Sequence, residues 1–144
     1  MTAPSPAPAC PCGSGAPYAG CCEPLHDNRV PAATAEQLMR SRYAAYALGR
    51  LDHVLRTWHP RTRPHDLADV PGLTWTGLEV LATEAGGPDD DAGVVEFRAS
   101  WAAPEGTGAQ HERSRFARRA GRWFYLDGEV GEDEVGDDRA GAGG

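Results

Sequence analysis

The stretch His111-Glu-Arg-Ser-Arg-Phe-Ala-Arg-Arg-Ala-Gly-Arg-Trp-Phe-Tyr-Leu-Asp127 predicts a β-hairpin. Its two arms, 111–119 and 122–127, flank Ala120-Gly121, which supplies a tight turn. Two segments upstream, 73–81 and 93–102, follow a period of two and are separated by a turn region over 86–91. One face of the second segment is made of Val95, Phe97, Ala99 and Trp101. Four successive strands of this kind predict an antiparallel meander.

A helix is predicted over residues 34–49, ahead of the strands. Thr34 is a suitable N-cap, Gln37 completes a capping box three residues later, and Gly49 ends the run. Between these ends, apolar and other core-forming residues recur at helical spacing: Leu38, Met39, Arg42, Tyr43, Tyr46 and Ala47.

A second helix is predicted over 52–58, where Pro60 stops it, and residues 60–72 predict a loop. Helices followed by a meander indicate an α+β domain, in which the helices cover one face of a curved antiparallel sheet. Four parts are predicted along the chain: a disordered start (1–9), a cysteine segment (10–28), the α+β domain (29–128) and a disordered acidic tail (129–144).

The charge of the chain argues against general binding to nucleic acid. The formal net charge is −7, and residues 129–144 hold six acidic residues against one arginine, so the rest of the chain carries only −2. The segment 113–122 holds five arginines, but alternation along a strand divides them between two faces. A nearly neutral body with an acidic tail is therefore not expected to bind phosphate backbones.

Nothing in the sequence predicts insertion into a membrane. No apolar run is long enough to span a bilayer, and residues 1–9 lack the charged start and apolar stretch of a signal peptide. We therefore expect a cytoplasmic protein, whose thiols stay reduced.

All four cysteines of the chain, Cys10, Cys12, Cys21 and Cys22, fall within thirteen residues. In a reducing compartment, thiolates concentrated in this way predict a metal site, and zinc is the metal that such a set favours. The alternatives are an iron–sulfur cluster, disulfides and free thiols. Adjacent Cys21 and Cys22 fit disulfide geometry poorly, which favours the metal.

Four thiolates complete a tetrahedral shell and leave no open position, so the predicted site is structural rather than catalytic. Gly13 and Gly15 allow backbone N–H groups to turn back toward the sulfurs. A competing interpretation replaces one cysteine with His26 and leaves a thiol free.

The segment Cys10-Pro-Cys-Gly-Ser-Gly-x-x-Tyr18-x-x-Cys21-Cys22 resembles the SEC-C motif. This zinc-binding module is known from the C-terminal end of the SecA translocation ATPase, where the last pair is Cys-His and Cys22 would take the histidine position. In SecA the module docks a chaperone partner, so the resemblance implies a zinc ligand set and a protein partner.

A longer resemblance, from Cys10 to Gly128, is to the YchJ family. It is carried by short motifs along the chain: Leu25-His-Asp27, Leu38-Met-Arg-Ser-Arg-Tyr43-x-x-Tyr46, Thr57-Trp-His-Pro60, Trp75-x-Gly77-Leu78, His111-Glu-x-Ser114-x-Phe116 and Gly121-Arg-Trp-x-Tyr-x-Asp-Gly128. These small bacterial proteins join an N-terminal SEC-C motif to a nuclear-transport-factor-2-like (NTF2-like) domain. The resemblance implies a cone of helices on a curved sheet and implies no particular reaction.

A sheet curved under helices can enclose a pocket for a small molecule or for proton-transfer catalysis. The polar candidates for lining it are Arg40, His59, Glu79, His111, Glu112, Ser114 and Asp127, and the apolar walls would be Trp58, Trp75, Trp101, Trp123 and Tyr125. His59 with Asp127 would form a possible acid–base pair. His111 and Glu112 are neighbours on one strand and point to opposite faces, so they cannot share a pocket.

The sequence therefore predicts a zinc-binding cytoplasmic protein with an accessory or interaction role, whose tetrathiolate segment presents a surface to a partner or to its own α+β domain. The alternative is a small-molecule or catalytic pocket in the α+β domain, with the zinc segment as a structural element. Catalytic residues stay unassigned.

Overall fold

The computed structural model describes residues 9–67 and 71–132. Along the chain the elements are η1 (Tyr18–Gly20), α1 (Glu23–His26), α2 (Ala35–Leu48), α3 (Leu51–Arg56), β1 (Thr74–Ala85), β2 (Ala92–Ala103), β3 (Gly106–Arg119) and β4 (Arg122–Glu132). The predicted disordered start, apart from Ala9, and the acidic tail beyond Glu132 lie outside the described residues.

Helix α2 begins and ends where the sequence predicted. The Thr34 hydroxyl oxygen accepts a hydrogen bond from the Gln37 N–H at 3.0 Å, and the Gln37 side chain accepts one from the Ala33 N–H at 2.6 Å. Gly49 closes the helix in the left-handed conformation, with φ at 77°, which a residue with a Cβ rarely adopts.

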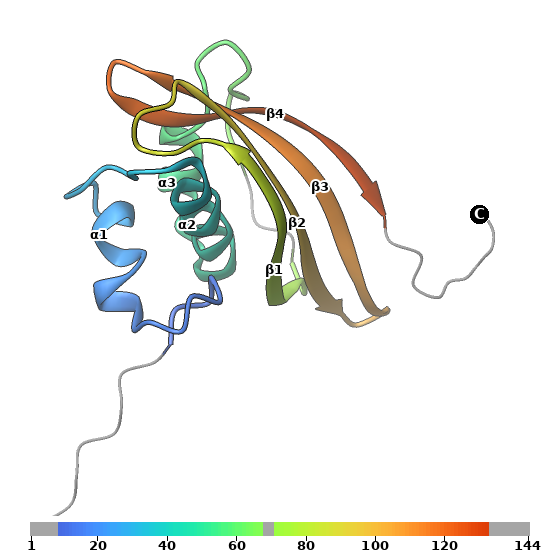
Figure 1. The fold of residues 1–144 in the computed structure, drawn as a ribbon. Helices are drawn as coiled ribbons and strands as arrows, with labels where there is room; N and C mark the ends of the chain where they lie inside the picture. Colours follow the sequence, from blue (N-terminus) through green and yellow to red (C-terminus); the bar gives the residue numbers. More distant parts are fainter. Residues whose placement is uncertain (1–8, 68–70, 133–144) are drawn as a thin grey trace, which may run out of the picture.

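The four strands form one antiparallel sheet in the order β1-β2-β3-β4, so the predicted meander and the α+β class are confirmed. Figure 1 shows the sheet curving around one side of α2, while α1 lies on the other side of the same helix. Register shifts between Trp75 and Gly77 and between Val80 and Ala82 interrupt β1, and a third lies between Arg115 and Phe116 in β3. Such irregularities bend strands, which helps the sheet curve.

All four strands extend beyond their predicted bounds, β2 (Ala92–Ala103) by only one residue at each end. β1 continues to Ala85, β3 begins at Gly106, and β4 continues to Glu132, so the predicted boundary of the tail at 129 was wrong for its first four residues. The reason is pairing, because the end of β4 lies against the middle of β3 with Glu132 opposite Gln110. Backbone hydrogen bonds thus hold a polar, glycine-rich segment in the sheet although its sequence lacks a strand pattern.

Helix α2 is packed on both sides, with different side chains on each. Toward the sheet, its large residues join Val95, Phe116 and Trp123 in the main core: Leu38, Met39 and Tyr43. Toward the cysteine segment it presents small residues, and the fully buried Ala44 joins the cysteine sulfurs in a second cluster. Small residues let the cysteine segment approach the helix closely.

The second helix is shorter than predicted, because α3 ends at Arg56 and the chain then runs beside β4. Trp58 forms a parallel bridge with Tyr125, in which the Tyr125 N–H donates to Thr57 O at 2.9 Å and the His59 N–H donates to Tyr125 O at 2.7 Å. Trp58 and Tyr125 both line the space between α2 and the sheet. In the described ranges, none of the helices has the length and apolar character needed to cross a membrane.

Candidate metal centre and central cavity

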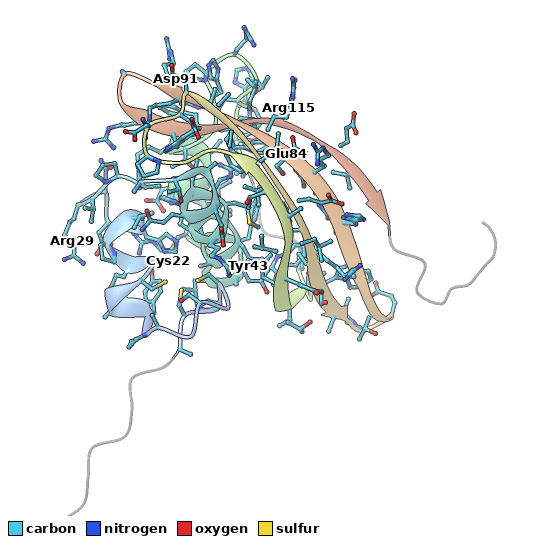
Figure 2. The ribbon with its side chains drawn as sticks, in the orientation of Figure 1. Cys22, Arg29, Tyr43, Glu84, Asp91 and Arg115 are labelled. Carbon is cyan, nitrogen blue, oxygen red and sulfur yellow. The ribbon has the colours of Figure 1, made fainter. Side chains whose placement is uncertain are left out.

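The structure brings the four predicted metal ligands together. Their Sγ atoms all lie within 4.8 Å of one another, although Cys10 and Cys12 come from one turn and Cys21 and Cys22 from another. Three of the residues are buried, and Cys21 is half-buried. Figure 2 shows sulfur atoms beside Cys22, between α1 and α2.

The sulfur spacing fits a tetrahedral metal ion. Zinc–thiolate bonds of about 2.3 Å place the sulfurs of a tetrahedron about 3.8 Å apart. Cys12 Sγ lies 3.6 Å from Cys21 Sγ, and Cys21 Sγ lies 3.9 Å from Cys22 Sγ. All four cysteines are free, so the disulfide alternative does not describe this structure.

The electrostatics of the cluster also favour a bound cation. Burial raises the pKa of the Cys10 thiol to about 11, whereas a hydrogen bond from Cys22 lowers the pKa of Cys12 to about 4. Sulfur anions this close together repel one another, so the protein groups alone do not ionise the whole set. A divalent ion would supply the missing positive charge.

Two glycines and a hydrogen bond from α2 fix the conformation of the loop that carries Cys10 and Cys12. Gly13 and Gly15 have φ values of 82° and 87°, in the left-handed region. The Ser14 hydroxyl lies 3.1 Å from Cys21 Sγ and can donate to a thiolate there. Arg40 donates from Nη1 to the Cys12 carbonyl at 2.7 Å, so its predicted place in the central pocket was wrong.

Replacing Arg40 with glutamine should weaken metal binding about tenfold, the lower end of the effect of groups that orient metal ligands. The reason is that Arg40 both fixes the Cys12 turn and brings a positive charge toward an anionic cluster. Competition with a chromophoric chelator measures the change. Glu36→Gln is the matched control: it removes the ion pair with Arg40 but keeps the Cys12 contact, and should cost less than about threefold. Equal losses in both variants would contradict this role.

His26 is not arranged as a metal ligand, so the competing ligand set was wrong. Its Nε2 lies 2.8 Å from Ser41 O, which can only accept, and its Nδ1 lies 2.7 Å from the Tyr18 hydroxyl. Both ring nitrogens are thus occupied by other groups. Burial lowers the pKa of His26, in keeping with a neutral ring.

A second buried histidine, on α3, lies next to His26 between the cysteine segment and the helices. His53 lies with its ring centroid 4.8 Å from that of His26. Its Nδ1 faces a donor, Arg56 Nη2, at 3.2 Å, so Nε2 carries the proton toward Ser41 Oγ at 2.9 Å. Ser41 Oγ in turn donates to Leu38 O at 2.7 Å. Burial lowers the pKa of His53 to about 3, and the nearby His26 and Arg56 add to the effect.

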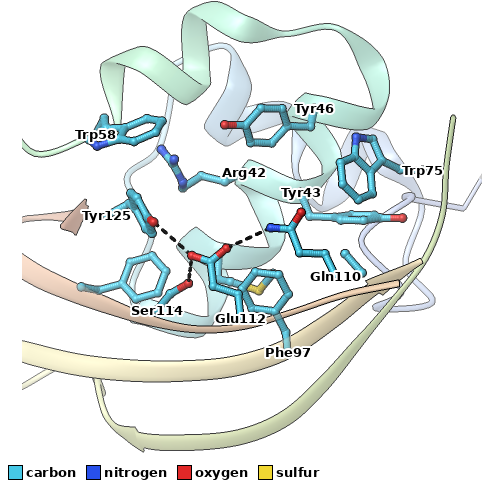
Figure 3. A pocket seen from close by; sticks show the side chains of 13 residues that line it. Arg42, Tyr43, Tyr46, Trp58, Trp75, Phe97, Gln110, Glu112, Ser114 and Tyr125 are labelled. Atoms are coloured by element: carbon cyan, nitrogen blue, oxygen red, sulfur yellow. Dashed lines mark hydrogen bonds between the residues drawn. The ribbon is translucent and has the colours of Figure 1, made fainter. Parts of the chain in front are cut away.

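The inner face of the sheet and α2 enclose a cavity of about 350 Å³ (Figure 3). Aromatic rings make most of its wall: Tyr43, Tyr46, Trp58, Trp75, Phe97, Phe116 and Tyr125. Tyr46 is the one exposed residue in the lining, so the cavity meets solvent on its side. A cavity of this size, lined by aromatic groups and a few polar ones, is typical of small-molecule sites.

Two charged side chains lie in this cavity. Glu112 is buried, and its carboxylate accepts hydrogen bonds from Ser114 Oγ at 2.7 Å, the Tyr125 hydroxyl at 3.0 Å and Gln110 Nε2 at 3.3 Å. Arg42 lies over the rings of Trp58 and Tyr125, at 5.0 and 4.6 Å from their centroids. Burial lowers the pKa of Arg42 to about 10, which leaves it charged near neutral pH.

Other predicted pocket residues lie elsewhere. On the outer face of the sheet, Glu79 pairs with Arg98, His111 with Glu96, and Asp127 with Arg115. His59 accepts from the Arg61 N–H, so the predicted His59–Asp127 pair does not form. Trp101 packs against Gly108, and Trp123 is part of the main core and donates to Ala33 O. The predicted separation of His111 from Glu112 is confirmed, because only Glu112 faces the cavity.

The sequence prediction of the cavity omitted residues on α2. Met39, Arg42, Tyr43 and Tyr46 all line it, and they recur at intervals of three, one and three residues. This spacing defines one helical face, and it was present in the sequence. Gln110 was also omitted, because the segment before residue 111 carried no strand pattern.

The fold and the site define an NTF2-like α+β domain that carries a cluster of four cysteines at its N-terminal end. A profile of the YchJ middle NTF2-like domain matches residues 34–128. The chain belongs to this family, as its resemblance predicted. Related UPF0225 proteins include one of Streptomyces coelicolor, 51% identical over 124 residues (86% of this chain and 97% of that protein), and one of Deinococcus radiodurans, 50% identical over 119 residues (82% and 86%).

Two solved structures share the fold. The solution structure of a SEC-C motif containing protein from Rhodopseudomonas palustris is 38% identical, with a TM-score of 0.73 over 83% of this chain and 96% of that one. A crystal structure of a SEC-C motif containing protein from Psychrobacter arcticus is 32% identical, with a TM-score of 0.67 over 82% and 80%.

Proposed function

We propose that the four cysteines bind one zinc ion, and that this ion fastens the N-terminal segment to α2 of an accessory protein in the cytoplasm. The observation that carries the proposal is the sulfur cluster, whose atoms lie within 4.8 Å of one another without disulfides. Four thiolates fill a tetrahedral shell, which supports a structural rather than a catalytic ion.

The contacts of the segment support this fastening role. Arg50 and Arg56 each donate to His26 O, at 3.1 and 3.0 Å, and Arg40 donates to Cys12 O. The segment is too short to hold these acceptors in place by a core of its own, so the ion would fix their positions.

Protein purified without chelator should contain about one zinc ion per chain, because four thiolates form a complete site. Elemental analysis measures the stoichiometry. Exchange for Co²⁺ should give the visible spectrum of a tetrahedral tetrathiolate, which distinguishes zinc binding from an iron–sulfur cluster. A folded protein with four titratable free thiols and no metal would end the proposal.

A second candidate function is small-molecule binding in the central cavity, supported by its size, its aromatic wall and the pair Arg42 and Glu112. The sequence also suggested that the zinc segment binds a protein partner. Such a partner could contact only the residues of the segment that α2 leaves exposed. Much of the segment faces α2, and its exposed residues lie at 13–15, 17, 19–20 and 27–28.

A further inference from the structure

Arg42 and Glu112 are both buried in the cavity, at 6% and 8% exposure, yet they do not form an ion pair within the described part of the chain. Figure 3 shows the guanidinium and the carboxylate facing the same space. Buried opposite charges normally meet directly, because separation forfeits their attraction without restoring their hydration. A polar group bound between the two residues would supply hydrogen bonds in place of the lost hydration.

Each of the two groups has unused hydrogen-bonding capacity. Arg42 donates from Nη1 to Val54 O at 2.7 Å and to Thr57 Oγ1 at 2.9 Å, while its Nε and Nη2 donate to no residue that the structure describes. Glu112 accepts two bonds on Oε2 but only one, at 3.3 Å, on Oε1. A carboxylate offers about four acceptor positions, so at least one is left. The cavity thus presents a donor and an acceptor together.

The charge of the site decides which ligands these groups favour. An anion drawn to Arg42 would meet the carboxylate of Glu112, and a cation drawn to Glu112 would meet the guanidinium of Arg42. In a buried site either repulsion is poorly screened. An uncharged group that accepts from Arg42 and donates to Glu112 satisfies both residues and leaves the charges balanced.

We propose that the cavity binds a small, uncharged aromatic compound that carries a primary carboxamide or a group with the same paired donor and acceptor. This inference rests on the binding role proposed for the cavity and adds the chemical class of the ligand. The walls favour an aromatic body, because most of the lining side chains are aromatic and aromatic rings attract one another in edge-to-face and offset contacts.

Three compounds of one shape test this class: benzamide, benzoate and benzamidine, which are respectively neutral, anionic and cationic near neutral pH. Binding to the zinc-loaded full chain is followed through the indole N–H signals in ¹H–¹⁵N spectra. Trp58 and Trp75 line the cavity, whereas Trp101 and Trp123 do not and serve as internal controls. Benzamide should move the first two signals and bind at least about tenfold more tightly than either charged analogue.

Glu112→Gln is the matched variant, because it keeps the shape and removes the negative charge. In this variant Arg42 is the only charged member of the pair, so the affinity for benzoate should rise at least about tenfold relative to the affinity for benzamide. If the variant does not fold, the ranking on the native protein still decides.

The outcomes separate this inference from the cavity's proposed role. If benzoate or benzamidine moves the same two signals and binds the native protein as tightly as benzamide, the uncharged class is wrong and the cavity remains a binding site. If none of the three moves Trp58 or Trp75, both the class and the binding role are overturned.

Discussion

Replacing Cys12 with serine should release the metal and lower the melting temperature by at least about 10 °C. Cys12 is fully buried, and its sulfur lies 3.6 Å from that of Cys21. Structural zinc contributes on the order of 10 kcal/mol to small sites, and each kcal/mol is worth several degrees in a domain of this size. Thermal unfolding followed by circular dichroism, with zinc content measured on the same samples, gives both quantities.

Chelator provides the control that separates loss of metal from loss of packing. A strong chelator should lower the melting temperature of the native protein toward that of Cys12→Ser, and should leave the variant unchanged because it has no metal to lose. Ser14→Ala keeps all four sulfurs and removes only the hydroxyl near Cys21, so it should retain zinc. A native protein that loses its zinc to chelator and melts unchanged would refute a stabilising ion.

The sequence predicted those parts of the fold that depend on local patterns. The capping residues Thr34 and Gln37, the terminal Gly49 and the four alternating segments act within a few residues, and all form the elements that were expected of them. The cysteine cluster is also a local feature, because only eight residues separate Cys12 from Cys21. Their approach to one another was therefore predictable, whereas α1, which follows them, was not.

The rest of the site depends on contacts between distant segments. Arg40 reaches Cys12 across 28 positions, and His26 reaches Ser41 across 15. The sequence around Arg40 and His26 contains no feature that points to these distant partners. Arg40 and Arg42 differ by only two positions, but on a helix this separates their directions by about 200°, since each residue turns about 100°. One faces the cysteine segment and the other the cavity.

Helix α2 thus connects the two sites. Ser41 and Ala44 support the cysteine segment, while Met39, Arg42 and Tyr43 form a wall of the cavity. A structural ion bound on one side of the helix would limit the movement of the side chains on the other, because both sets are fixed to one rigid element. Under the two proposals above, the metal would therefore stabilise one wall of a ligand site on the opposite side of the helix.

The buried His53 should make stability fall as the pH falls. Its pKa of about 3 lies below the ordinary value of 6.5, so the unfolded chain binds the proton more readily. The stability due to the neutral ring is complete above about pH 6.5 and is lost progressively between pH 6.5 and 3.

A comparison of variants isolates this contribution from any loss of zinc in acid. His53→Gln should destabilise the protein at pH 7.5. At pH 5.5 the loss of unfolding free energy caused by the substitution should be smaller by about 1.4 kcal/mol. The reason is that the unsubstituted protein alone is destabilised in acid by a histidine that must stay neutral in the folded state. Urea unfolding of both proteins at both pH values, with the same zinc concentration, measures the difference. Thr34→Ala removes a cap without removing a titrating group, so its cost of about 1 kcal/mol should be the same at both pH values. A His53→Gln cost that stays constant or grows in acid would mean that His53 is protonated in the folded state.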